Sequence, residues 1–128
     1  MIRTTRRGAL AGALAIPAAA ALAKSPKRKP SGTVLLHDPL LEAGRRFADA
    51  GEARGVSVLA IEGDRIRFAR AVFEQSPALV VAVGRAADRV LIEDVGREAG
   101  YVPAAVPPAI ARLLHTRSAR PWALAPRT

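Results

Sequence analysis

Three short apolar runs constrain most strongly what this chain can fold into. They occupy residues 33–37, 56–61 and 78–83 and are rich in β-branched side chains. Continuous apolar runs of this length are typical of strands buried on both faces, as in parallel sheets. The stretch that follows each run carries apolar residues at helical spacing. The pattern therefore predicts a β-α-β-α-β-α order, and right-handed crossovers then give a small three-layer α/β sandwich with a short parallel sheet.

Each of the three predicted helices has a candidate inward face. Its members are Leu40, Gly44, Phe47, Ala48 and Gly51 in the first helix, Ile66, Ala69 and Phe73 in the second, and Ala87, Val90, Leu91 and Val95 in the third. Asp38 followed by Pro39 is typical of a helix start, and Asp64 can cap the second helix in the same way. Gly55 and Gly100 stand where a left-handed residue is expected after a helix end.

The sandwich is expected to cover residues 33–101, and residues 102–128 form a C-terminal segment rich in proline and arginine. The first part of that segment predicts a loop or extended chain, followed by a short helix over residues 109–114. Residues 121–126 carry enough apolar surface to dock as one extra edge strand, where terminal prolines are tolerated. A disordered tail is the alternative for this segment.

The N-terminus has the parts of an export signal. Arg6 and Arg7 precede an apolar run over residues 8–23 that ends in small side chains. This combination predicts a signal peptide over residues 1–23 that is cleaved after Ala23. The run is shorter than the roughly 20 apolar residues that a membrane-spanning helix needs, so a permanent anchor is a weaker alternative.

The arginine pair, with Thr5 before it and Leu10 after it, resembles the twin-arginine export signal, although Ala9 and Ala11 depart from that pattern. An ordinary secretion signal is the alternative route. A basic, proline-rich linker follows over residues 24–32. We therefore expect a periplasmic or secreted protein that has no stable membrane span after signal removal.

The charge distribution argues against a nucleic-acid partner. The chain has twenty basic and eleven acidic residues, with a formal net charge of +9. The excess lies at the two ends, because residues 33–101 contain nine arginines and all eleven acidic residues. Nucleic-acid binding favours a basic stripe interleaved with aromatic residues. This chain has only five aromatic residues and no such stripe. An unknown protein partner or a small ligand is the expected class of partner.

Several chemistries are excluded by residue type. The chain contains no cysteine, which excludes disulfides, thiol nucleophiles and cysteine-ligated clusters. Its glycines are isolated, so neither the dinucleotide-binding nor the phosphate-binding glycine pattern is present. No cofactor is therefore predicted.

Polar residues follow the predicted strands, where ligand sites form in open α/β sheets. His37, Asp38 and Glu62 could hold a divalent metal or act as a general acid and base. Arg85 could bind a carboxylate or phosphate. The competing interpretation is structural, because Asp38 and Asp64 are also expected to cap helices. We take these five residues as candidate ligand-binding positions, and no catalytic residue or metal ligand is assigned.

Short segments spread over most of residues 33–127 carry a further resemblance. They are His37-Asp38-Pro39, Gly44 to Ala48, Ile61 to Asp64, Gly84, Glu98 to Gly100, and Trp122 to Arg127. In these segments the mature region resembles an uncharacterised bacterial family of small exported proteins with a twin-arginine-type signal peptide. The resemblance implies export and a compact α/β domain, with no catalytic residues to carry over.

Three hypotheses for the function stay open. The first is an exported accessory or binding domain without a recognisable catalytic motif. The second is a small enzyme with a strand-end site built on His37, Asp38 and Glu62, which a metal could assist. The third is a truncated relative of a larger sheet protein, whose exposed sheet edges need a partner. The first is the preferred hypothesis.

Overall fold

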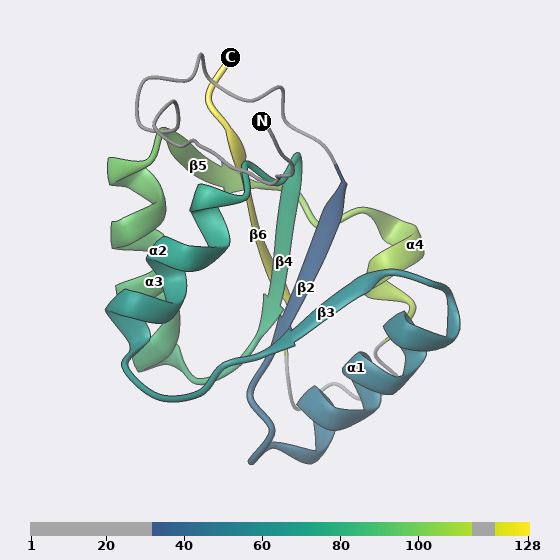
Figure 1. Ribbon diagram of the computed structural model, residues 1–128. Helices are drawn as coiled ribbons and strands as arrows, with labels where there is room; N and C mark the ends of the chain where they lie inside the picture. Colours follow the sequence, from purple (N-terminus) through teal and green to yellow (C-terminus); the bar gives the residue numbers. More distant parts are fainter. Residues whose placement is uncertain (1–31, 114–119) are drawn as a thin grey trace, which may run out of the picture.

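A five-stranded mixed sheet organises the chain (Figure 1). The computed structural model describes residues 32–113 and 120–128. Its strands are β2 (Thr33–His37), β3 (Ser57–Ala60), β4 (Leu79–Val83), β5 (Tyr101–Ala104) and β6 (Trp122–Pro126). Its helices are α1 (Glu42–Ala53), α2 (Arg65–Glu74), α3 (Ala86–Glu98) and α4 (Pro108–Ala111).

The strands lie in the order β3-β2-β4-β6-β5. β2 pairs in parallel with both β3 and β4, so Leu36 lies between Leu59 and Ala82. β6 runs antiparallel to both of its neighbours, β4 and β5. The three predicted strands are therefore confirmed, and two further strands make the sheet mixed.

Helices cover both faces of the sheet. Figure 1 shows α2 and α3 on one face and α1 and α4 on the other. Successive strand residues point to opposite faces, and two separate apolar cores result. Leu36, Phe73 and Ile92 belong to the core beneath α2 and α3, whereas Leu35 and Phe47 belong to the core beneath α1 and α4. The predicted small α/β sandwich is confirmed.

The C-terminal strand has a different place from the one predicted. The extra strand forms, and the disordered tail is wrong for these residues, but β6 lies between β4 and β5 instead of at an edge. The edge is taken by β5, where the sequence predicts a loop or extended chain after residue 101.

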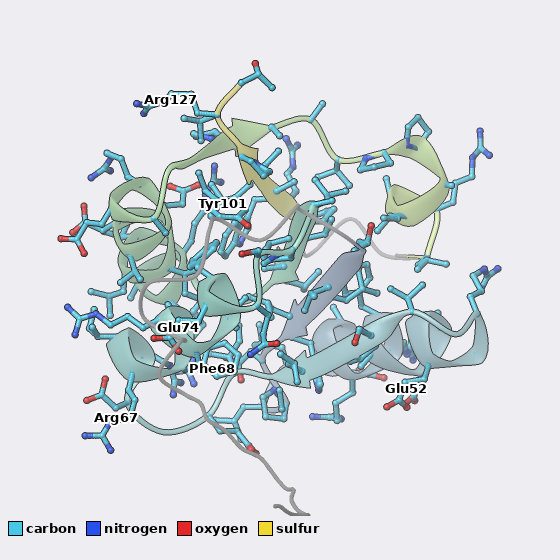
Figure 2. The ribbon with its side chains drawn as sticks, turned by 45° about the horizontal axis from the view of Figure 1, so that its top comes forward. Glu52, Arg67, Phe68, Glu74, Tyr101 and Arg127 are labelled. Carbon is cyan, nitrogen blue, oxygen red and sulfur yellow. The ribbon has the colours of Figure 1, made fainter. Side chains whose placement is uncertain are left out.

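Tyr101 anchors β5, because its ring packs 4.7 Å from that of Phe73 and its hydroxyl donates to the Pro77 carbonyl at 2.6 Å. Pro103 lacks a donor and suits an edge position. The position of Tyr101 over the core can be followed in Figure 2.

The predicted inward face of the third helix is right at Val95 and wrong at Ala87, Val90 and Leu91. Val90 is 65% exposed and Leu91 39% exposed, and the buried residues of α3 are Asp88, Ile92, Val95 and Gly96. Gly96 faces inward because its missing side chain allows a close approach, since a Cβ there would lie 2.9 Å from Phe73 Cζ. Apolar periodicity alone cannot identify a face that is built around a glycine and an aspartate.

The start of the first helix also differs from the prediction. α1 begins at Glu42 with Leu41 as its N-cap, and no side chain caps it. Asp38 therefore does not cap this helix, and Leu40 is 75% exposed. The Asp64 cap on α2 is confirmed. So are the left-handed residues after α1 and α3, because Gly55 and Gly100 have φ of +75° and +89°.

Two further predictions concern segments at the margins of the described residues. The short helix expected over residues 109–114 is α4, which begins earlier, at Pro108, and ends at Ala111. The signal-peptide residues Arg6, Arg7 and Ala23, together with most of the linker, lie outside the described residues. Within the described part of the chain, no helix has the length and apolar character needed to span a membrane.

Gly44 should be intolerant of a side chain, although alanine normally favours a helix over glycine. A Cβ at Gly44 would lie 2.5 Å from the backbone oxygen of Asp38, which cannot move without breaking the turn. We expect Gly44→Ala to lower the free energy of unfolding by about 1–3 kcal/mol, as overpacked sites do, measured by urea denaturation.

Gly51→Ala in the same helix is the matched control. The closest atom there is the terminal Cδ1 of Leu35, which is the far end of a flexible side chain. A smaller loss is therefore expected. Equal losses for the two variants would show that the Asp38 turn does not limit the approach of α1.

Candidate functional site

The candidate site lies where the chain reverses its direction of travel across the sheet. From β2 the chain passes through α1 to β3 on one side, and from β3 it passes through α2 to β4 on the other side of β2. The carboxyl ends of β2 and β4 therefore diverge into connections on opposite faces. In open α/β sheets, ligands bind in the crevice at such a point. Here Asp38 follows β2, and Arg85 follows β4 after one glycine.

Asp38 and Arg85 form an ion pair across this point. The Arg85 Nε donates to Asp38 Oδ2 at 2.9 Å, and the Leu40 N–H donates to Asp38 Oδ1 at 2.9 Å. The Asp38 side chain is 1% exposed and that of Arg85 is 52% exposed. Both carboxylate oxygens are thus bonded within the protein, whereas part of the guanidinium faces solvent.

The pair holds Asp38 in its charged form. Burial is the largest single effect and acts to raise the pKa of Asp38. The hydrogen bonds from Arg85 and Leu40 and the charges of Arg85 and Arg65 together outweigh it, so the pKa lies below its usual value of 3.8. A carboxylate that stays ionised at neutral pH, with both oxygens occupied, is poorly suited to proton transfer.

A second ion pair lies beside the first and joins α2 to α3. Arg65 Nε donates to Asp88 Oδ1 at 3.0 Å, and Arg65 Nη1 donates to the Gly63 carbonyl at 2.7 Å. The other carboxylate oxygen of Asp88, Oδ2, is buried without a hydrogen-bond partner among the described residues. Arg65 is not among the residues predicted from the sequence. A buried carboxylate requires a partner, but Asp88 is recognised as buried only once the packing of α2 against α3 is known.

The other candidate residues are distributed around this point. His37 ends β2 and is half-buried, with its Nδ1 buried and unpartnered among the described residues. Glu62 is exposed. Asp64 accepts the N–H groups of Ile66 and Arg67 at 2.9 and 3.0 Å, and the bond from Arg67 lowers its pKa although the slight burial of the carboxyl opposes this. Asp64 is therefore occupied as a helix cap.

The structure does not assemble a metal site from these residues. Among residues 32–113 and 120–128, no group of three or more His, Cys, Asp or Glu side chains is placed to hold a metal ion. His37, Asp38 and Glu62 therefore do not form the ligand set that the sequence allowed. Asp38 and Arg85 are brought together, as a structural ion pair.

No family model matches this chain, and neither a curated protein nor a solved structure does. The resemblance to small exported bacterial proteins stays a prediction. The function has to be inferred from the chemistry of the described residues.

Removing the charge of Asp38 should destabilise the fold. Asp38→Asn keeps the shape of the side chain but leaves Arg85 without its anionic partner, and we expect a loss of about 1–3 kcal/mol in the free energy of unfolding at pH 7. Glu98→Gln is the matched control at an exposed carboxylate, with an expected change within about 0.5 kcal/mol. Urea denaturation measures both, and equal stability of the two variants would contradict a structural role for the pair.

The advantage of the wild type over Asp38→Asn should also depend on pH. Because the pKa of Asp38 is lower in the folded chain, the unfolded chain binds the proton first. The contribution of Asp38 is therefore complete above pH values near its usual pKa of 3.8 and is lost as the pH falls through the lower folded value. The difference in unfolding free energy between the two proteins should narrow as the pH falls below 3.8, and a constant difference would contradict this linkage.

Proposed function

We propose that this chain is a small exported domain that binds a protein partner or a small ligand and does not itself turn over a substrate. The observation that carries the proposal is the Asp38–Arg85 pair at the carboxyl ends of β2 and β4. This is the place where an α/β enzyme presents its reactive groups. Here the carboxylate is buried, ionised and bonded through both oxygens.

The remaining polar residues near this point support the same conclusion. Asp64 is occupied at the N-terminus of α2, and Asp88 pairs with Arg65 between two helices. These groups hold the connections after the parallel strands in place. A rigid scaffold of this kind suits a domain that acts by presenting its surface to a partner.

The proposed location outside the cytoplasm depends on the N-terminal segment. Paired arginines, a mildly apolar run and a small-residue end support export, and the arginine pair supports the twin-arginine route, which carries folded proteins. A domain without cysteine needs no oxidising environment to fold. It can therefore complete its fold before it is exported.

A catalytic function built on His37 and Glu62 is the second candidate. It is favoured by the buried Nδ1 of His37, which has no hydrogen-bond partner among the described residues. This ring nitrogen is a hydrogen-bonding group that the described residues leave unused. The exposed Glu62 could serve the same bound molecule as this nitrogen only if that molecule spans the ends of β2 and β3.

The binding function predicts that His37 and Glu62 can be replaced without loss. The protein purified from its native compartment should carry its partner or ligand in stoichiometric amount, as measured by native mass spectrometry. The double variant His37→Ala with Glu62→Ala should carry the same species in the same amount. Loss of that species from the double variant would place its binding site at His37 and Glu62, whereas its replacement by an altered molecule of different mass would favour the enzyme.

The export proposal predicts a dependence on the arginine pair. Arg6→Lys with Arg7→Lys should leave the chain in the cytosol at full length, because the twin-arginine route recognises the pair. Arg3→Lys is the matched control and should be exported and shortened like the wild type. Immunoblots of cell fractions measure both. Export of the double variant would contradict the twin-arginine route, and a full-length wild type in the cytosol would contradict export itself.

A further inference from the structure

The edge strand β3 is short, at four residues, but it has none of the side chains that normally prevent edge-to-edge pairing. Proteins guard such edges with charged residues, prolines or bulges, yet residues 56–61 contain neither a charge nor a proline. Leu59, in the middle of the strand, is 43% exposed. The opposite edge of the sheet, β5, contains Pro103. One edge of the sheet therefore carries a proline that hinders pairing, and the other edge has neither a proline nor a charge.

The backbone of β3 has free hydrogen-bonding groups along this edge. The Ile61 N–H donates to the His37 carbonyl at 2.8 Å, so residue 61 faces β2. Because alternate residues of a strand direct their N–H and C=O groups to opposite sides, Val58 and Ala60 face outward. Val56, just before the strand, offers only its carbonyl, because its N–H donates to the Gly51 carbonyl at 3.0 Å. Among the described residues, no strand pairs with this side of β3.

An apolar groove runs beside the same edge, on the face that α2 covers. Its volume is about 270 Å³, and it is lined by Val34, Leu59, Phe68, Ala71, Val72 and Gln75. Figure 2 shows Phe68 toward the centre of the molecule, whereas Arg67 points away from it. A strand added to β3 would therefore cover apolar surface as well as satisfy backbone groups.

The charges at the two ends of β3 favour a second copy of this chain as the occupant. Arg54 lies before the strand and Glu62 lies after it, and both are exposed. Neither side chain takes part in an ion pair among the described residues. An antiparallel copy places the two ends of the strand against each other, so opposite charges meet at both ends of the seam.

One register satisfies the backbone and the charges together. When Val58 faces Val58 of the second copy on the two-fold axis, the Ala60 N–H lies opposite the free carbonyl of Val56, once on each side of the axis. Arg54 lies in the turn between α1 and β3, because it is the C-cap of α1 and left-handed Gly55 follows it. This turn is at the same end of the seam as Glu62 of the second copy. A shift of one residue would place inward-facing residues opposite outward-facing ones and lose the backbone bonds.

We propose that two copies of this chain pair antiparallel through β3, joining two five-stranded sheets into one continuous sheet with an Arg54–Glu62 contact at each end of the seam. The two apolar grooves then lie along the seam. This interaction surface is independent of the Asp38–Arg85 site, so the failure of one proposal leaves the other standing.

Charge reversal tests the proposal, with the association measured by sedimentation velocity over a dilution series. The wild-type protein, as purified from the cells that produce it, should be a dimer at high concentration and should dissociate on dilution. Arg54→Glu places like charges at both ends of the seam, and so does Glu62→Arg. Each should raise the dimer dissociation constant by about tenfold or more, because two attractive contacts become repulsive.

Mixing the two variants gives the decisive result. A chain with Glu at both positions complements a chain with Arg at both, so the mixture should form a heterodimer as tightly as the wild type pairs. The double variant Arg54→Glu with Glu62→Arg should also dimerise on its own. A mixture that stays as weak as its components would overturn the antiparallel pairing.

The controls separate this seam from other modes of association. Glu98→Arg reverses an exposed charge on α3 and should leave the dimer unchanged. Leu59→Lys should abolish pairing without loss of the fold, as checked by thermal melting. A wild-type monomer at all concentrations would overturn the proposal, as would a dimer that Leu59→Lys does not affect. The first result is also the one expected if another part of the same chain, or a different protein, covers the edge.

Discussion

Asp38 is bound to the rest of the fold through each of its polar groups. Its N–H donates to the Val83 carbonyl at 3.0 Å, and its own carbonyl accepts the Leu41 N–H at 3.1 Å. Its carboxylate accepts one bond from Leu40 and one from Arg85. A buried carboxylate is costly to leave without partners, so this set of bonds requires the connections after β2 and β4 to lie side by side. The entry angle of α1 depends on the same turn, because Gly44 packs directly on the Asp38 backbone oxygen.

This use of Asp38 has a functional consequence. The crevice between the diverging strands is the usual position for a ligand in an α/β sheet, and here protein groups fill it with internal bonds. A second pair, Arg65 with Asp88, holds α2 against α3 at the same end of the sheet. The carboxyl end is therefore mainly a rigid junction between the two helical layers, and only part of the Arg85 guanidinium is left to solvent.

The two edge strands of the sheet, β5 and β3, differ in their side chains. The antiparallel pair β5 and β6 extends the parallel strands on one side and ends in a strand that carries a proline. On the other side, β3 is short, uncharged and bordered by an apolar groove. Helix α1 covers the opposite face of β3 and leaves its outer edge open. Among the described residues, the sheet edge without a charge or a proline thus lies on the β3 side.

The sequence by itself determined the three parallel strands, the helices between them and the left-handed glycines at the helix ends. These features depend on local properties, namely apolar periodicity, β-branching and backbone conformation, which neighbouring residues in the chain are enough to specify. It also identified Asp38 and Arg85 as members of one strand-end cluster, because the carboxyl ends of parallel strands share one side of the sheet.

Only the tertiary structure decided the remaining features. The place of β6 between β4 and β5 depends on a pairing between residues 101–104 and 122–126, and nothing in either segment alone specifies its neighbour. The inward face of α3 is set by Asp88 and Gly96, through an ion pair with Arg65 on another helix and a close approach to Phe73. Asp38 forms a buried ion pair instead of the predicted helix cap, because Arg85, 47 residues later in the chain, lies beside it only after folding. Each of these outcomes depends on contacts between distant segments, which sequence periodicity does not encode.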